Sequence, residues 1–259
     1  MIPLFDSLAH PTLSGNWPKH PASCSFPQLV RSLDDAGYIG ACAVGMPRLE
    51  GYEHASFIAA CRPYPQLIPI AGYDPNAETS ANGLSELRDL GFVGIKIHPR
   101  FSKITRNLRQ LADVFRAAGA CGLVVFYCTY MHGTIGSYPK RDPFYDLIDL
   151  LDDAPKTKVV LVHGGDVSLL RYAELVRFNE QLLLDLSLTL MKYAGSSIDS
   201  DLRFLFSRFD QRICIGTDFP EYSPAEVRAR FGHLAGDLPE GKQINIGHAN
   251  LLNFLGHRR

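Results

Sequence analysis

The segments GIKIHP (94–99), LVVFYC (123–128) and KVVLVHGG (158–165) decide the fold of this 259-residue chain. Each is a short apolar run rich in branched residues, which is typical of a strand buried on both faces. A longer amphipathic segment of helical period precedes each run, and strands that alternate with helices pair in parallel. Each run also contains or ends in a residue that can bind a metal or transfer a proton. The carboxyl ends of parallel strands share one edge of a sheet, so these residues predict a common site.

The same alternation extends through the whole chain. Strands are predicted at 2–9, 38–45, 67–73, 93–98, 122–128, 158–163, 181–187 and 212–217. Helices are predicted near 26–36, 53–61, 80–90, 104–119, 143–152, 167–178, 197–209, 224–234 and 248–255. Eight such units with no break in composition predict an α/β fold, a single (β/α)8 TIM-barrel domain over residues 1–259.

Local residues agree with these boundaries. Ser25 and Ser223 each stand just before a proline-containing helix start, which predicts an N-cap. Three glycines follow helical patterns just before strands and predict left-handed helix ends: Gly37, Gly91 and Gly119.

Two strand-to-helix connections are unusually long, at 11–25 and 129–142. In a barrel such loops lie at the C-terminal face, where substrates bind. Trp17 in the first loop, and Tyr130 and His132 in the second, are therefore candidate substrate-binding residues.

Charge, hydropathy and cysteine content limit the classes of partner and the cellular compartment that can be expected for this chain. The formal net charge of −1 gives no electrostatic reason to expect nucleic acid or an anionic membrane as a partner. No apolar run is long enough to span a bilayer, and the first residues run into a strand without a basic leader. Six scattered cysteines without a CxxC pair indicate a reduced, cytoplasmic protein, with Cys42 and Cys214 as small buried apolar residues.

GIKIHP carries the clearest local argument for a site. Alternation places Lys96 and His98 on one side of the strand and the two isoleucines on the other, so the polar pair should face the barrel interior. An inward Lys96 can pair with an anionic substrate, accept a carbamate or act as a base. Alternatively, a buried carboxylate such as Asp6 or Asp185 neutralises it.

Three further strand ends carry polar residues. Asp218 ends ICIGTD and can bind a metal and accept a proton from water, or simply cap the following turn. His163 precedes two glycines, and there it can act in the site or hydrogen-bond a neighbouring loop. His10 ends the first strand and faces the same mouth. Together these residues predict a cluster at the mouth of the barrel.

Several segments, taken in order, resemble one family. They are YDPN (73–76), GFVGIKIHP (91–99), VVLVHGG (159–165), ICIGTDFP (213–220) and IGHANLLNFLG (246–256). The resemblance covers essentially the whole chain and is to amidohydrolase-related proteins. It is closest to their branch of metal-dependent hydrolases and decarboxylases, such as aminocarboxymuconate semialdehyde decarboxylase.

The resemblance implies a (β/α)8 barrel and a divalent metal, often zinc. The family's ligands are an HxH on strand 1, a histidine on strand 5, a histidine on strand 6 and an aspartate on strand 8. His10, His163 and Asp218 match three of these positions, and Cys128, whose thiolate can bind zinc, stands at the fourth. Leu8 replaces the first histidine, which predicts an altered site.

Three functions follow from this site. The first is a hydrolase that uses one divalent metal, with Asp218 as general base and His163 polarising the substrate carbonyl. The second is a metal-free lactonase or decarboxylase in which Lys96, His98 and Arg100 supply the positive charge. The third is a non-catalytic protein that binds a small molecule. The cationic trio favours a small carboxylated substrate, and related barrels suggest a homodimer.

Overall fold

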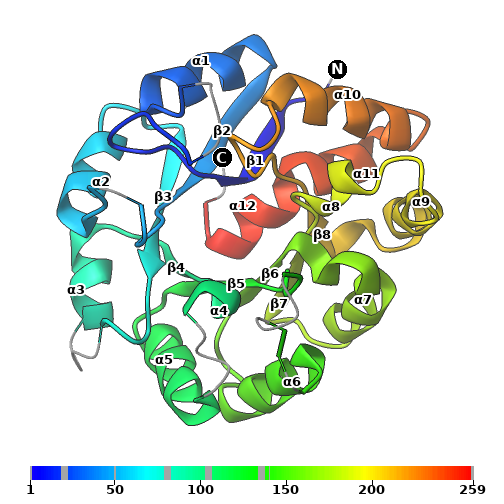
Figure 1. Cartoon of the computed structure of the whole chain (residues 1–259). Coiled ribbons are helices and arrows are strands. Elements are labelled where there is room, and N and C mark those ends of the chain that lie inside the picture. Colours follow the sequence, from blue (N-terminus) through cyan, green and yellow to red (C-terminus); the bar gives the residue numbers. More distant parts are fainter. Residues whose placement is uncertain are drawn as a thin grey trace.

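The computed structural model describes residues 2–18, 23–49, 51–78, 83–102, 107–133, 138–139 and 141–257. At its centre are eight parallel strands, which pair in the order in which they occur in the chain. Helices surround them, as the view along the barrel in Figure 1 shows. The predicted (β/α)8 TIM barrel is therefore confirmed.

The strands are β1 (Leu4–Ala9), β2 (Tyr38–Val44), β3 (Leu67–Tyr73), β4 (Gly94–Ile97), β5 (Val124–Cys128), β6 (Val159–Val162), β7 (Leu182–Asp185) and β8 (Ile213–Cys214). The first seven helices are α1 (Phe26–Asp35), α2 (His54–Cys61), α3 (Gly83–Leu90), α4 (Pro99–Ser102), α5 (Leu108–Ala120), α6 (Pro143–Asp153) and α7 (Leu169–Arg177). They are followed by α8 (Thr189–Lys192), α9 (Ile198–Arg208), α10 (Pro224–Ala235), α11 (Glu240–Ile244) and α12 (Asn250–Leu255).

The barrel closes between β1 and the segment that follows β8. Three backbone hydrogen bonds join them: Ser7 N to Ile215 O (3.0 Å), Asp218 N to Leu8 O (2.9 Å) and His10 N to Phe219 O (2.8 Å). The strand predicted at 212–217 is regular only over Ile213–Cys214. Beyond it, the chain at Gly216 passes so close to β1 that a Cβ atom would lie 2.9 Å from the Leu8 nitrogen.

Alternate residues of the strands face the interior. Lys96 pairs in register with Phe126, and Phe126 belongs to the apolar cluster that fills the barrel. Ile95 and Ile97 belong instead to the cluster between the sheet and the helices. The predicted inward direction of Lys96 is therefore confirmed.

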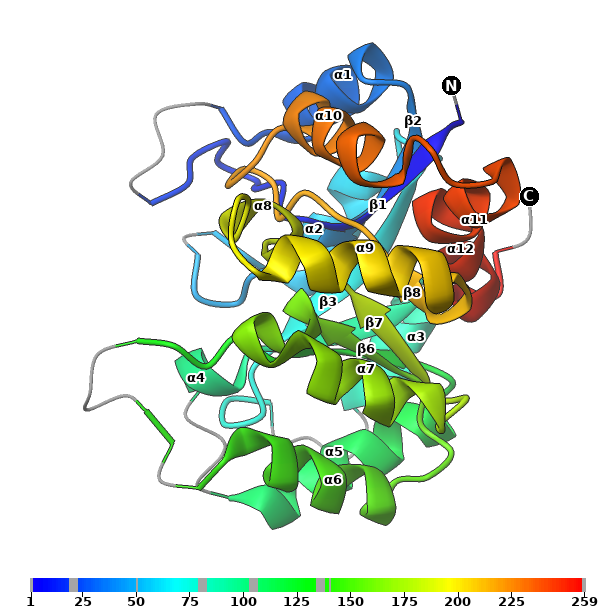
Figure 2. The same cartoon turned by 90° about the vertical axis from the view of Figure 1, so that its right-hand side faces the viewer.

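The C-terminal helix closes one end of the barrel. Leu251, Leu252 and Leu255 of α12 pack in the interior cluster with Phe5 and Phe126. Figure 2 shows α11 and α12 at one end and the long loops at the other. A substrate therefore has to enter at the loop end, where the strands finish.

The predicted helix starts are confirmed. Ser25 accepts a hydrogen bond from the N–H of Gln28 at the start of α1. Ser223 forms a capping box with Glu226 at the start of α10.

One predicted helix end is wrong. Gly37 and Gly91 adopt positive φ angles of 71° and 108°, but Gly119 lies inside α5. Gly119 packs so closely that a Cβ atom there would lie 2.4 Å from Thr157 Oγ1. The residue with positive φ in this turn is Gly122 (φ 70°).

Two further expectations concern composition. Within the described ranges, no helix is long and apolar enough to cross a membrane. All six cysteines are free, and Cys42 and Cys214 are buried as predicted.

Candidate active site

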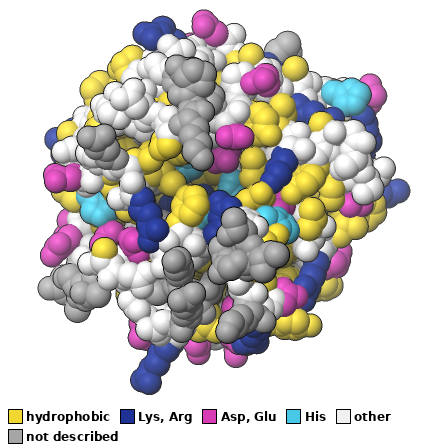
Figure 3. All heavy atoms as spheres, in the orientation of Figure 1, with side chains coloured by type: hydrophobic (Ala, Val, Ile, Leu, Met, Phe, Trp, Pro, Cys, Tyr) yellow, Lys and Arg dark blue, Asp and Glu magenta, His cyan; other side chains and the backbone are white. Residues whose placement is uncertain are grey.

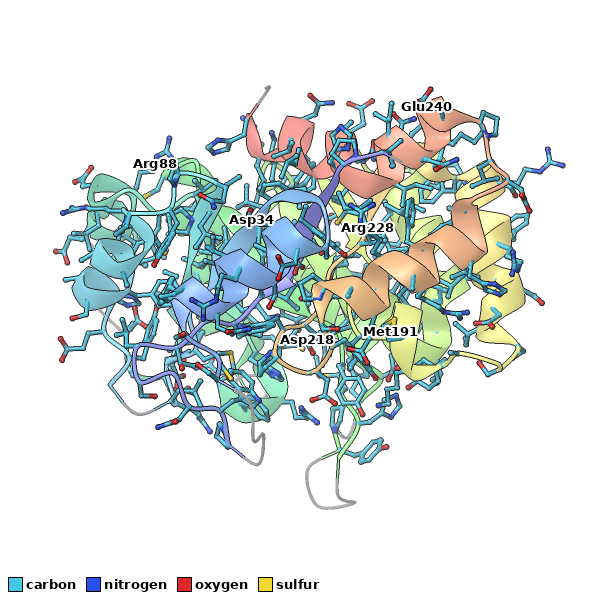
Figure 4. The ribbon with its side chains drawn as sticks, turned by 90° about the horizontal axis from the view of Figure 1, so that it is seen from above. Asp34, Arg88, Met191, Asp218, Arg228 and Glu240 are labelled. Carbon is cyan, nitrogen blue, oxygen red and sulfur yellow. The ribbon has the colours of Figure 1, made fainter. Side chains whose placement is uncertain are left out.

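The predicted site residues lie at the open end of the barrel. Seen along the barrel, Lys or Arg and His side chains gather near the centre of this face (Figure 3). Figure 4 shows Asp218 toward this end and Glu240 of α11 toward the opposite end. The strand ends and loops indicated by the sequence therefore form one mouth.

Asp218 follows β8 and faces His10, which follows β1. His10 Nε2 lies 3.4 Å from Asp218 Oδ1. Burial alone would raise the pKa of Asp218. The positive charge of His163, the hydrogen bond from His10 and the charge of Lys96 instead hold this pKa well below its usual range. Asp218 is therefore an ionised carboxylate at the mouth, able to accept a proton.

The orientation of His10 follows from its other ring nitrogen. Nδ1 lies 2.9 Å from the carbonyl oxygen of Val44, so Nδ1–H donates there and Nε2 is directed at Asp218. Trp17 stacks on the imidazole, with ring centroids 5.6 Å apart. The loop residue Trp17 is therefore brought to the site, and it is the only tryptophan of the chain.

His163 follows β6 in a left-handed backbone conformation, with φ at 70°. Its N–H donates to Asp185 Oδ2 at 3.2 Å, and its Nδ1 lies 3.1 Å from the carbonyl oxygen of Ser187. Burial alone would lower the pKa of His163, but the charges of Asp218 and Cys128 raise it above the ordinary 6.5. His163 is thus held by Asp185 of β7 and by Ser187 just beyond it, and it keeps its proton to higher pH than an ordinary histidine.

Cys128 ends β5 between two histidines. Its Sγ lies 3.6 Å from His98 Nε2, and its side chain also contacts His163. Burial alone would raise the pKa of the thiol, but His98 and His163 hold it well below 9.0. Cys128 therefore adds negative charge beside His163.

Lys96 is buried, with 2% of its surface exposed, and lies close enough to Asp218 to lower the pKa of that carboxyl. Asp6 accepts hydrogen bonds from Thr217, and Asp185 accepts from Ser187. Neither forms an ion pair with Lys96, nor does any other carboxylate in the described part of the chain. The alternative that a buried carboxylate neutralises Lys96 is therefore wrong for these residues.

Leu8 stands where the resemblance places a metal-binding histidine. It is fully buried and packs in the interior cluster with Phe5 and Val44. Its side chain is therefore part of the apolar core beneath the site and offers no ligand.

The remaining predicted donors do not converge on one point. His10 pairs with Asp218, whereas Cys128 lies against His98 and His163. In the ranges that the structure describes, no three His, Cys, Asp or Glu side chains are grouped so that they could hold a metal ion. As arranged, with the Lys96 ammonium nearby, these residues do not fit a metal, and the zinc site stays a prediction.

Arg100, Tyr130 and His132 lie on the rim. The Arg100 guanidinium carbon lies 4.9 Å from the Tyr130 ring centroid, and Arg100 donates to the carbonyl oxygen of His132. The His132 side chain turns to Asp166, with Nε2 2.7 Å from Oδ2. His132 therefore pairs with Asp166 rather than with the predicted metal donors.

His98 borders a cleft beside the site. Its ring stacks on Phe101, with centroids 3.9 Å apart. The cleft encloses about 20 Å³, room for about one water molecule. It is lined by Met46, Pro47, Arg48, Tyr73, Asp74, Lys96, His98, Phe101 and Ser102. The Lys96 and His98 side chains therefore line the same cleft.

Two residues of the mouth were missed by the sequence analysis. Asp166 follows His163 by three residues and is buried; its place in VHGGD was the available signal. Lys192 ends α8, and its ammonium lies 4.1 Å from the Tyr130 ring centroid. No pattern around Lys192 marks it, because α8 is a single turn outside the main alternation.

Three solved structures illustrate the fold. A TIM-barrel protein from Bordetella bronchiseptica is 17% identical, with 99% of both chains covered and a TM-score of 0.79. A candidate 2-pyrone-4,6-dicarboxylic acid hydrolase from Pseudomonas putida is 16% identical, with 100% of this chain and 99% of that chain covered and a TM-score of 0.69. A 5-carboxyvanillate decarboxylase from Sphingomonas paucimobilis is 13% identical, with 99% of both chains covered and a TM-score of 0.72.

No curated protein sequence matches the chain. A family model does, and it is that of the amidohydrolases, matching residues 22–250. These residues include every strand of the barrel except β1. The protein therefore belongs to the amidohydrolase family.

Proposed function

We propose that the protein is an enzyme that hydrolyses an ester or lactone of a small carboxylated molecule at the barrel mouth. The observation that carries the proposal is the ionised Asp218 carboxylate, 3.4 Å from His10 and close to His163 and Lys96. A carboxylate base beside cations that can polarise a carbonyl is the combination that activates water. Two similar structures are named for activities on carboxylated molecules.

Lys96 binds the substrate carboxylate in this proposal. A buried ammonium without a carboxylate partner in the described part of the protein is costly, and an anionic ligand reduces that cost. The added negative charge also weakens the positive field around Asp218. The pKa of Asp218 then moves back toward its usual range, so this carboxylate becomes a stronger base once substrate is bound.

The hydrolytic step follows from these roles. Asp218 accepts a proton from water as the water oxygen attacks the carbonyl carbon. His163 Nε2–H donates a hydrogen bond to the carbonyl oxygen and stabilises the oxyanion that forms. When the carbon–oxygen bond breaks, the leaving oxygen takes the proton from Asp218, and the new carboxylic acid then releases its own proton to solvent and becomes a carboxylate.

Amidohydrolases commonly use divalent metals, and the resemblance predicts zinc on His10, Cys128, His163 and Asp218. We propose instead that the cations of the protein itself supply the positive charge. The Lys96 ammonium would repel a divalent cation at the mouth. No step above requires a metal.

Metal content separates these two forms of the enzyme. The purified protein is assayed for zinc and manganese before and after dialysis against a chelator, and hydrolysis of a panel of carboxylated lactones and esters is measured in parallel. We expect substoichiometric metal and unchanged hydrolysis after dialysis. Near-stoichiometric metal, with activity lost on dialysis and restored by zinc, would replace the metal-free proposal.

The base is tested with Asp218→Asn. We expect kcat to fall by roughly 10²- to 10⁴-fold, the usual contribution of a general base. Asp152→Asn, at an exposed aspartate near the end of α6, removes the same charge far from the mouth and is the control. Unchanged activity in Asp218→Asn would eliminate this base.

The same assays distinguish the two alternative functions. Release of carbon dioxide would indicate a decarboxylase, and tight binding without turnover would indicate a binding protein.

A further inference from the structure

Two cations from different strand ends contact the ring of Tyr130. The Arg100 guanidinium carbon lies 4.9 Å, and the Lys192 ammonium nitrogen 4.1 Å, from the ring centroid. The Tyr130 hydroxyl also accepts a hydrogen bond from Lys192. Each cation is attracted to the aromatic ring, but the two positive charges repel each other. Arg100, Lys192 and Tyr130 therefore form a part of the rim with two positive charges, and the neutral Tyr130 ring does not neutralise them.

Neither cation is balanced by a carboxylate. No aspartate or glutamate in the described ranges forms an ion pair with Arg100 or Lys192, whereas several other arginines are paired, such as Arg171 with Asp142 and Arg177 with Glu174. Arg100 Nε is buried and has no hydrogen-bond partner within those ranges. A buried donor without an acceptor is costly, so this part of the rim is suited to an anion.

This part of the rim lies close to the strand-end residues His163 and Lys96. The Tyr130 ring meets His163 edge-on, with centroids 6.2 Å apart. Lys96 ends the inward row of β4, and Arg100 follows in α4, four residues along the chain. Met191, next to Lys192, lies toward the same end of the molecule as Asp218 in Figure 4. The rim and the strand-end residues therefore lie at the same mouth, with His163 next to the Tyr130 ring.

We propose that Lys192, Arg100 and the Tyr130 hydroxyl bind a second anionic group of the substrate, so that the substrate is a dianion whose first carboxylate lies on Lys96. This inference rests on the proposed function for the placement of the first carboxylate. It assigns Lys192 as a specificity-determining residue at the rim. The expected class is a small molecule with two carboxylates separated by a ring or a short chain.

Binding of two simple probes tests the inference without turnover. Benzoate and isophthalate share one ring and differ by one carboxylate, and the fluorescence of Trp17, which stacks on His10, reports binding of either. We expect the wild type to bind isophthalate about tenfold or more tightly than benzoate, the usual gain from one charge-assisted hydrogen bond. Equal affinities, or no binding of either probe at millimolar concentration, would overturn the inference.

The variant Lys192→Gln tests whether the preference for isophthalate over benzoate comes from Lys192. We expect the ratio of benzoate to isophthalate dissociation constants to fall to within about twofold of one, because a neutral amide cannot replace the charge. Tyr130→Phe, which keeps the ring and removes the hydroxyl, should reduce the ratio in part. Lys156→Gln, at an exposed lysine before β6, removes the same charge at the other end and should keep the wild-type ratio. A wild-type ratio in Lys192→Gln would exclude Lys192.

The two proposals fail in different measurements. Hydrolysis that does not depend on Asp218 contradicts the proposed function, even if isophthalate is preferred. Equal binding of isophthalate and benzoate by the wild type contradicts the assignment of Lys192, Arg100 and Tyr130 to a second anionic group, even if Asp218-dependent hydrolysis of monocarboxylates is found.

Discussion

Oδ1 of Asp6 accepts a hydrogen bond from the backbone N–H of Thr217 at 2.8 Å. The Thr217 hydroxyl also bonds to Oδ2 of Asp6. This pair fastens β1 to the segment after β8, one residue before Asp218. Burial raises the pKa of Asp6 to about 7, although the hydrogen bonds from Thr217 and Leu8 oppose the shift. The joint that closes the barrel thus depends on a carboxyl that titrates near neutral pH.

We expect Asp6→Asn to flatten the pH dependence of stability. In the folded protein the carboxyl has a pKa of about 7, against 3.8 when exposed, so folding favours the protonated form. Its contribution to stability is therefore full below about pH 4 and is lost as the pH rises through 7, by up to about 4 kcal/mol. Urea unfolding at several pH values between 4 and 8 measures this slope. An equally steep slope in Asp6→Asn would assign the titration to another group.

We expect Gly216→Ala to destabilise the fold. An added Cβ would lie 2.3 Å from Ser7 Oγ and 2.9 Å from the Leu8 nitrogen, so the segment after β8 would have to move away from β1. Overpacking of this kind costs about 1–3 kcal/mol. Gly232→Ala in α10, where a Cβ meets nothing within 4 Å, is the control and should be neutral or stabilising. Similar unfolding free energies for the two variants would show that the joint at Gly216 tolerates a side chain.

The barrel could be predicted because its signal is repeated. Alternation places Lys96 inward and its isoleucine neighbours outward, and eight strand–helix units leave few other arrangements. β8 was predicted too long because ICIGT has strand composition. The sequence does not reveal that Gly216 meets β1 so closely that the regular ladder ends at Cys214.

The sequence predicts where the site residues lie, but not which of them are in contact. His10, Cys128, His163 and Asp218 each end a strand, so their common location follows from the fold. Which of them pair does not follow, because the pairing depends on side-chain rotation and on loop contacts between distant segments. Lys192 was missed because its partner Tyr130 lies 62 residues away in the sequence.

We expect Cys128→Ser to move the alkaline limb of the pH profile to lower pH. Hydrolysis as proposed needs a protonated His163, so activity falls as the pH rises through the pKa of this imidazole. The negative charge of Cys128 helps to raise that pKa, and a neutral serine removes this contribution. The measurement is kcat/KM against pH for both proteins. Cys214→Ser, at a buried cysteine inside β8, is the matched control. An unmoved limb in Cys128→Ser would mean that His163 does not govern it.

We expect Lys96→Met to move the acid limb of kcat/KM to higher pH. The Lys96 ammonium helps to hold the pKa of Asp218 well below its usual range, so the carboxylate stays ionised in the wild type at pH values where an ordinary aspartate is protonated. Without that charge, Asp218 takes up a proton at higher pH and stops acting as a base. Residual activity is measured on one substrate between pH 3 and 6, with circular dichroism to identify unfolding. Lys96→Arg keeps the charge and should keep the wild-type limb, even if binding weakens. If Lys96→Met loses activity equally at every pH, Lys96 acts on the substrate alone and not on the basicity of Asp218.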